Sequence, residues 1–298
     1  MEPCSLVILM EAYRNFLDKH SKETDENERN EVHQVFASVA EKYLKYRPKY
    51  PEELITEAIQ LSPLLHKTTG DQSPHILELG CGPATLTLPL LKRGFRVTAV
   101  DPGTGMIALA KEVCKEYVAT NQVEFFESTF ANFETDQKYD AIVAASSFHW
   151  VMAEPDPDAI RARLHSILKP QGTLILFWNG QPQLDQRIQD SVADALNQPK
   201  ESGGEAAVKM FDERLLDPLV ESKLFAPFTT RICSIDRAVD LEDYFEWLKT
   251  FSTCIRMSPE EQEEHFRKMA SVLRNECDAN NLLPTVVRSR VNVTTRVD

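Results

Sequence analysis

The sequence lacks closely spaced cysteine pairs, long apolar runs and an excess of basic residues. Its six cysteines form no Cys-x-x-Cys pair and match no zinc-ligand spacing, so we expect reduced thiols and no metal site. No segment approaches the ~20 consecutive apolar residues that a membrane span needs. The first residues lack the basic region and cleavage pattern of a signal peptide. These absences predict a soluble, cytoplasmic protein that does not bind membranes.

The charge balance restricts the partners. The chain has 46 Asp and Glu against 33 Lys and Arg, a net charge of −13. An acidic surface repels phosphate backbones, so we expect no nucleic-acid partner. With 298 residues, 42% of them apolar, the chain is long enough for one large α/β domain with an appendage. We expect a small-molecule substrate and a monomer or homodimer.

Apolar strands and amphipathic helices alternate through the middle of the sequence. Strands are expected at 76–79, 95–100, 123–126, 139–145 and 173–178, with helices at 84–93, 106–117 and 157–168. Strands separated by helices of this length are typical of βαβ units, so we predict a parallel sheet covered on both faces. A last strand at 286–297 is expected to be antiparallel at the edge of the sheet.

The two ends of the chain do not show this alternation of strands and helices and are expected to be mainly helical. We divide the chain into a helical extension and lid at 1–60, a cofactor-binding core at 61–180, and a helical cap insertion with terminal strands at 181–298. Further helices are expected at 6–17, 31–46, 52–61, 185–223, 241–250 and 259–276, and a strand at 228–235. Trp247 and Phe251 share one helix face and are expected in the core.

A glycine loop follows the first predicted strand of the core. Gly80 and Gly82 lie where that strand meets a helix, and Asp101 ends the next strand 21 residues after Gly80. Such a loop lets backbone approach a ligand, and an acid at this place takes both hydroxyls of a ribose. The strand, glycines, helix, strand and acid together indicate an adenosine cofactor. The alternative is a tight turn in an α/β protein that binds no cofactor.

The residues around the loop favour one adenosine cofactor. A dinucleotide site would have a third glycine where Thr85 stands, and Glu78 disfavours a phosphate but suits a cation. The chain has no GxxxxGK[ST] motif, which disfavours a nucleoside triphosphate. S-adenosylmethionine has adenosine, no phosphate, a sulfonium and an ammonium. We therefore predict S-adenosylmethionine as cofactor and S-adenosylhomocysteine as product.

The run from Glu78 to Thr85, followed by Val100-Asp101-Pro102, resembles the first two motifs of class I S-adenosylmethionine-dependent methyltransferases. The resemblance implies a doubly wound, seven-stranded Rossmann-like sheet whose last strand is antiparallel, with a helical cap from the N-terminus and a C-terminal insertion. Where many relatives carry an acid near the adenine, this chain has Ser128 and Thr129. The residues expected at the cofactor are Glu78, Gly80, Cys81, Gly82, Asp101, Pro102, Met106, Ser128, Thr129, Phe130 and Ser146.

A narrower resemblance is carried by residues 36–43, Arg47-Pro48-Lys49-Tyr50-Pro51, Ser147-Phe148-His149-Trp150 and Phe177-Trp178-Asn179. These runs are similar to the trans-aconitate methyltransferase-like group, whose members act on small molecules. The resemblance covers roughly residues 31–180, about half of the chain. It implies a lid that closes over the cofactor. The residues expected in the lid or on the substrate side are Tyr43, Arg47, Tyr50, Trp178 and Asn179.

His149 and Trp150 are the candidate catalytic residues, because they follow the fourth strand, where the transferred methyl group is expected. His149 is a candidate ligand for an anionic substrate or a candidate base, and the alternative is a helix-start histidine satisfied by backbone. Trp150 is a candidate cation–π partner of the sulfonium or a plain core residue. Arg47 is a candidate two-pronged carboxylate ligand or a surface residue at a helix end.

We therefore predict a metal-independent methyltransferase that acts on a small molecule, and an anionic one is favoured. Carboxylate O-methylation and thioether S-methylation are the leading options, with amines and hydroxyls behind them. One alternative is a protein or RNA methyltransferase, against which the acidic charge and the lack of an Asn-Pro-Pro-Tyr-type motif argue. The other is an S-adenosylmethionine-binding module without catalysis.

Overall fold

A computed structural model describes residues 40–66, 73–153, 156–200, 212–255 and 257–298. The helix predicted at 6–17 and the first part of the one predicted at 31–46 lie outside these residues. Within the described ranges no helix is both long and apolar enough to cross a membrane.

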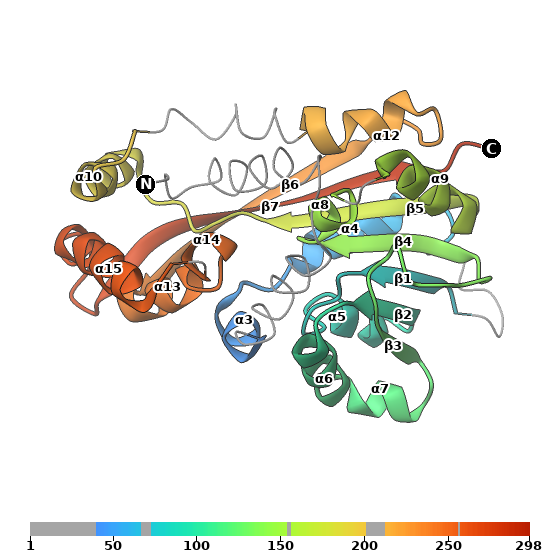
Figure 1. The fold of residues 1–298 in the computed structure, drawn as a ribbon, viewed down its shortest axis with the longest axis horizontal. Coiled ribbons are helices and arrows are strands. Elements are labelled where there is room, and N and C mark those ends of the chain that lie inside the picture. Colours follow the sequence, from blue (N-terminus) through green and yellow to red (C-terminus); the bar gives the residue numbers. More distant parts are fainter. Residues whose placement is uncertain (1–39, 67–72, 154–155, 201–211, 256) are drawn as a thin grey trace.

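One seven-stranded sheet organises the molecule, with the strand order β3-β2-β1-β4-β5-β7-β6 (Figure 1). The first five strands pair in parallel, and β7 is antiparallel to both of its neighbours. The strands are β1 (His75–Leu79), β2 (Arg96–Asp101), β3 (Val123–Glu127), β4 (Tyr139–Ala145), β5 (Leu168–Asn179), β6 (Thr229–Asp240) and β7 (Leu282–Thr295).

Helices cover both faces of the sheet, which is why its central strands are apolar at almost every position. Successive side chains of β1 illustrate this: Ile76 packs into the core on one face and Leu77 into the core on the other. The first face carries α4 (Glu52–Gln60), α5 (Thr87–Lys92), α6 (Thr104–Val113) and α7 (Lys115–Ala119). The second carries α8 (Phe148–Val151), α9 (Pro157–Ile167) and α12 (Asp217–Glu221).

The place predicted for the last strand was wrong. β7 does not lie at the edge of the sheet but is inserted between β5 and β6, so β6 forms the edge. Alternating side chains indicate that a segment is a strand, but they do not indicate which strands become its neighbours. The strand predicted at 228–235 is β6, which continues to Asp240.

Several helix boundaries also differ from the prediction. The helix expected at 185–223 is not continuous, because its first part ends at Leu196 and Asn197 is left-handed. The helix expected at 106–117 is split into α6 and α7 at Cys114, which belongs to neither helix. The helix expected at 157–168 ends at Ile167, and Leu168 already belongs to β5.

β6 and β7 extend beyond the end of β5. The pairing of β5 with β7 stops at Asn179 and Ser289, whereas β6 and β7 remain paired as far as Asp240 and Leu282. This extension and the helices around it form what we call the arm, residues 181–200 and 234–288. The arm holds α10 (Gln186–Leu196), α13 (Leu241–Leu248), α14 (Ser252–Ile255) and α15 (Pro259–Leu273), and a third apolar cluster.

The short helix α3 (Ala40–Tyr46) lies next to the arm. Its Lys42 forms a salt bridge of 2.7 Å with Glu246 on α13, and Tyr46 packs against the apolar cluster of the arm. The segment after α3, residues 47–51, then leads to α4 on the sheet. The lid predicted from the sequence therefore connects the core with the arm. The three predicted domain boundaries stay predictions.

Candidate cofactor and acceptor site

The loop after β1 is held by close backbone contacts. Gly80 and Gly82 have φ values of +67° and +52°, in the left-handed region that favours glycine. The Gly80 N–H donates to the carbonyl oxygen of Val100 over 2.7 Å, which ties the loop to β2. A Cβ on Gly80 would lie 2.4 Å from the Cβ of Ser147, whereas a Cβ on Gly82 would meet nothing within 4 Å. The loop thus packs tightly against the end of β4 and leaves space at Gly82.

Asp101 joins this loop to the start of α6. Its Oδ2 accepts from the Gly82 N–H over 2.9 Å, and its Oδ1 accepts from the Gly103 N–H over 2.8 Å. Burial raises the pKa of Asp101, and the two backbone hydrogen bonds oppose that rise. The carboxylate is therefore fixed at the end of β2, where the sequence places a ribose ligand.

Glu78 is fully buried in β1 behind the loop. Its Oε2 accepts from the hydroxyl of Thr87 over 2.6 Å, and within the described ranges its Oε1 has no hydrogen-bond partner. Burial raises the pKa of Glu78 to about 8; the Thr87 hydrogen bond opposes this rise, and the negative charge of Asp101 adds to it. A cation close to Glu78 would favour its charged form. Cys81, the middle residue of the glycine loop, is also buried, and burial raises the pKa of its thiol well above the usual range.

The residues expected near the adenine follow β2 and β3. The Ser128 N–H donates to the carbonyl oxygen of Asp101 over 3.1 Å. The Ser128 hydroxyl donates to the carbonyl oxygen of Thr129 over 3.0 Å. The Thr129 hydroxyl accepts from the backbone N–H of Asn132 over 3.3 Å. Both hydroxyls are thus engaged within their own loop. Pro102, Met106 and Phe130 complete this set; Met106 and Phe130 are buried and Pro102 partly so.

The end of β4 brings together Ser146, Tyr50 and the candidate catalytic residues. Ser146 has a φ of +57°, and its hydroxyl shares a hydrogen bond of 2.9 Å with Tyr50. His149 and Trp150 lie on α8 with their ring centroids 5.1 Å apart. His149 is 7% exposed, and burial lowers its pKa to about 4, so its imidazole is neutral at pH 7.

Arg47 is held between the lid and the arm. Its Nε donates to the hydroxyl of Thr250 over 2.8 Å, and its Nη2 donates to the Thr250 carbonyl oxygen over 3.1 Å. The guanidinium carbon lies 3.7 Å from the ring centroid of Phe251 and 4.8 Å from that of Tyr43. Burial lowers the pKa of Arg47, and no carboxylate in the described part of the chain forms a salt bridge with it. Arg47 follows the end of α3 and is held against the arm, and its role as a carboxylate ligand stays a prediction.

Asn179 uses both ends of its amide to fix the lid. Its Nδ2 donates to the carbonyl oxygen of Pro48 over 2.8 Å, and its Oδ1 accepts from the hydroxyl of Ser289 over 2.6 Å. Trp178 is partly buried and packs against the core cluster on the α8 side of the sheet. The substrate contacts predicted for both residues stay predictions.

Sequence reasoning missed Thr250, Thr87 and the closeness of Ser147 to Gly80. Thr250 lies 203 positions after Arg47, and no local pattern connects two residues so far apart. Phe251 was expected in the core and is buried, but it also supports the guanidinium of Arg47. In the described ranges no three His, Cys, Asp or Glu side chains are grouped so that they could hold a metal ion.

Residues 76–172 match the family model described as a methyltransferase domain. The chain is 32% identical over 141 residues to an uncharacterized methyltransferase of Staphylococcus carnosus, covering 45% of this chain and 65% of that protein. It is 35% identical over 113 residues to trans-aconitate 2-methyltransferase of Enterobacter, covering 37% and 41%. The chain thus spans less than two thirds of the length of these relatives.

Solved structures share the fold. A provisionally assigned type II methyltransferase from Anaeromyxobacter dehalogenans superimposes with a TM-score of 0.57 at 21% identity, covering 84% of this chain and 97% of that one. The parallel strands, the glycine loop and the acid that ends β2 define a Rossmann-like domain for an adenosine cofactor. Residues 76–172, which match the methyltransferase-domain model, contain this loop and this acid, so this part of the chain is similar to the class I S-adenosylmethionine-dependent methyltransferases.

The residues present fit that cofactor. Gly82 leaves open space over the loop, and Asp101 holds a carboxylate at the end of β2. Glu78 keeps one buried carboxylate oxygen without a hydrogen-bond partner among the described residues, which suits a ligand with positive charge.

Proposed function

We propose that the protein transfers a methyl group from S-adenosylmethionine to a small anionic molecule. The cofactor supplies an electrophilic methyl group on a sulfonium. The observation that carries the proposal is Arg47, a cation that is held in place without a carboxylate partner in the described part of the chain.

Partial burial of a guanidinium without a counter-ion in the described part of the chain costs free energy, so its position favours an anionic ligand. Thr250 and Phe251 fix the group from the arm side through Nε, Nη2 and the face of the guanidinium. The planar fork of an arginine suits the two oxygens of a carboxylate. Two carboxylates are candidates, one on the methyl acceptor and one on the methionine part of the cofactor.

The state of His149 bears on the kind of acceptor. A general base works best when its pKa lies near the working pH, and burial lowers the pKa of His149 to about 4. A neutral, weakly basic imidazole suits acceptors that need no deprotonation, such as carboxylates and thioethers. Amines and hydroxyls that bind in the protonated form must lose a proton to a base, and an imidazole with so low a pKa accepts a proton poorly. His149 then orients the acceptor by hydrogen bonding.

The relatives support a small acid as acceptor. The Enterobacter protein is by name a methyltransferase of trans-aconitate, and it is 35% identical to this chain over 113 residues. The resemblance in the segments around Arg47 and His149 points to the same group. Methylation of a thioether, the other leading option, is also consistent with the proposal if the acceptor molecule carries a carboxylate that Arg47 can bind.

The chain's own residues contribute mainly by positioning. Asp101 and the backbone of the glycine loop hold the nucleoside, while Tyr50 and Ser146 order the end of β4. Arg47 and Asn179 connect the lid to the arm and to β5, so that a closed lid excludes water. Alignment of two reactants in this way can contribute about 7–11 kcal/mol.

The alternatives predict different acceptors. A protein or RNA methyltransferase would methylate a macromolecule, and a binding module would hold S-adenosylmethionine without turnover. A screen of small acids, thioethers and amines for S-adenosylhomocysteine release separates all three. The cytoplasmic location and the monomeric or dimeric state stay predictions.

The cofactor part of the proposal is tested by Asp101→Ala. The substitution removes a carboxylate that orients Gly82 and Gly103 and takes the ribose, so we expect S-adenosylhomocysteine affinity to fall at least about a hundredfold. Titration calorimetry measures the affinity. Glu124→Ala, which removes an exposed acid of β3, is the matched control and should change it less than about twofold. Equal affinities for Asp101→Ala and the wild type would overturn the assignment.

The anion part is tested by Arg47→Gln. If Arg47 binds the acceptor, KM for an active carboxylate substrate should rise at least about tenfold while the affinity for S-adenosylhomocysteine stays unchanged. If the cofactor affinity falls instead, Arg47 holds the methionine carboxylate. Arg231→Gln, at an exposed arginine of β6, is the control. A variant with unchanged KM and unchanged cofactor affinity contradicts both readings of Arg47.

A further inference from the structure

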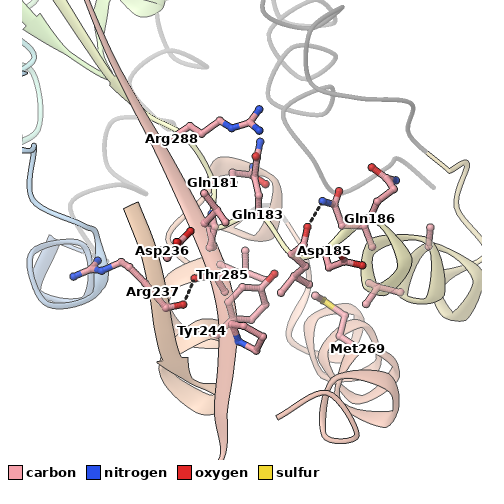
Figure 2. A pocket seen from close by; sticks show the side chains of 18 of the residues that line it. Gln181, Gln183, Asp185, Gln186, Asp236, Arg237, Tyr244, Met269, Thr285 and Arg288 are labelled. Atoms are coloured by element: carbon pink, nitrogen blue, oxygen red, sulfur yellow. Dashed lines mark hydrogen bonds between the residues drawn. The ribbon is translucent and has the colours of Figure 1, made fainter. Parts of the chain in front are cut away.

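The arm contains a cavity of about 770 Å³ between α10, the ends of β6 and β7, α13 and α15 (Figure 2). None of the residues that we assign to the cofactor, the lid or catalysis lines it. Its size lies within the range of small-molecule sites. The cavity is therefore a second candidate site, separate from the one at Gly80 and Asp101.

The floor of this cavity is apolar. It combines buried apolar side chains from α10 and the segment before it with buried apolar side chains from α13 and α15. They are Leu184, Val192, Leu196, Leu248 and Met269. An apolar group that enters this floor gains about 25 cal/mol for each Å² removed from water.

Two opposite charges lie together on one wall. Asp236 pairs with Val286 in the register of β6 and β7, and Ser234 pairs with Arg288, so Asp236 and Arg288 are diagonal neighbours on one face. Such neighbours are about 7–8 Å apart. Figure 2 shows Arg288 directed toward the α10 side of β7, and Arg237 directed away to the other side.

Within the described ranges, neither Asp236 nor Arg288 forms a salt bridge, with the other or with a third residue. The wall that carries them is rigid, because the backbone of Gln183 both donates to and accepts from Val286 over 2.8 Å. An acid and a base that line the same cavity and are not paired with each other in the described ranges are suited to a ligand that carries both charges.

We propose that this cavity binds an α-amino acid with an apolar side chain. Its carboxylate pairs with Arg288, its ammonium pairs with Asp236, and its side chain enters the apolar floor. Charge-assisted hydrogen bonds of about 2.8 Å would hold the head group of the amino acid at each end. A simple anion or a simple cation would leave one of the two charges unmatched.

Titration calorimetry on the full chain tests this site. The probes are L-leucine, L-methionine and L-phenylalanine, added in the presence of saturating S-adenosylhomocysteine so that the methionine part of the cofactor site is blocked. We expect saturable binding of at least one probe. N-acetyl-L-leucine lacks the ammonium and L-leucine methyl ester lacks the carboxylate, and each should bind at least about tenfold more weakly than L-leucine. Glycine, which lacks the side chain, should also bind more weakly.

Three single substitutions locate the binding. Arg288→Gln and Asp236→Asn remove exposed charges on the cavity wall, and each should weaken binding of the best probe at least about tenfold. Arg237→Gln removes the arginine that points away, and it should leave the affinity unchanged. Circular dichroism confirms that all three variants fold.

Three results would overturn the proposal. The first is no saturable binding of any of the three amino acids. The second is binding that S-adenosylhomocysteine abolishes, which would place the amino acid in the cofactor site. The third is an affinity for the best probe that is the same in Arg288→Gln, Asp236→Asn and Arg237→Gln. A parallel titration without S-adenosylhomocysteine distinguishes the second result from the first. Because calorimetry measures binding and not methyl transfer, none of these results depends on the proposed function.

Discussion

The hydrogen bonds that hold the two acids of the cofactor site and those that build the arm differ in how far apart in the sequence their partners lie. In the core, Gly82 and Asp101 are 19 positions apart, and Glu78 and Thr87 are nine apart. In the arm, Arg187 meets Glu276 at a separation of 89, and the Thr285 hydroxyl reaches the Arg237 carbonyl oxygen at a separation of 48. Sites built from near neighbours leave motifs in a sequence, whereas sites built from distant segments do not.

A few contacts join the two regions. Lys42 pairs with Glu246 on α13, and Arg47 is fixed by Thr250 at the end of the same helix. Asn179 connects the lid to Ser289 on β7. The lid therefore depends on the arm, although its own motif lies next to the core in the sequence.

The largest expected effect comes from Gly80→Ala in the core. A Cβ there would meet Ser147 at 2.4 Å and occupy a left-handed residue, so the combined strain and overpacking should lower the free energy of unfolding by about 2–5 kcal/mol. Gly94→Ala is the matched control, because Gly94 has a φ of +84° but open space around its Cβ. It should cost about 1–2 kcal/mol, from the backbone alone.

Urea unfolding of the two variants measures this difference. A larger loss for Gly80→Ala would show that the loop needs glycine for its close contact with β4 and not only for its φ. Equal losses would mean that the loop and Ser147 can move apart, and that the core site is less tightly built than we describe.

The next effect is a pH dependence of stability from Glu78. The folded pKa is about 8 and the ordinary value is 4.5, so the folded state holds this proton more tightly than the unfolded state. The stabilisation is complete below about pH 4.5 and is lost as the pH rises through 8, with a slope of at most about 1.4 kcal/mol per unit. Glu78→Gln removes this slope.

Urea titrations at pH 5, 6, 7 and 8 measure the difference between Glu78→Gln and the wild type. Glu53→Gln, at an exposed acid of α4, should follow the wild type at every pH. A wild-type profile parallel to that of Glu78→Gln would mean that Glu78 is charged in the folded state and has found a partner.

Particular residues show how far the sequence could lead. The glycine loop, Asp101 and the alternating strands predicted the parallel sheet and the kind of cofactor, because each pattern is local. Two features depend on the path of the chain in space. They are the insertion of β7 between β5 and β6 and the hydrogen bonds between Thr250 and Arg47. The raised pKa of Glu78 depends on burial from both faces of the sheet, which no single segment displays.

The smallest expected effect, and the one that links the two regions most directly, comes from Thr250→Val. The substitution keeps the shape of a fully buried side chain but removes the hydroxyl that accepts from Arg47 Nε over 2.8 Å. Thr250 touches neither reactant, so it acts as a positioning residue, and loss of a hydrogen bond to a charged group should cost about 1–2 kcal/mol, or roughly tenfold. We expect this as a rise in KM for the anionic acceptor with kcat nearly unchanged, while Thr230→Val, which removes a hydroxyl from β6, leaves KM as it is. A roughly tenfold fall in kcat at constant KM would instead mean that the arm affects the transfer of the methyl group itself. Core and arm would then not have separate roles.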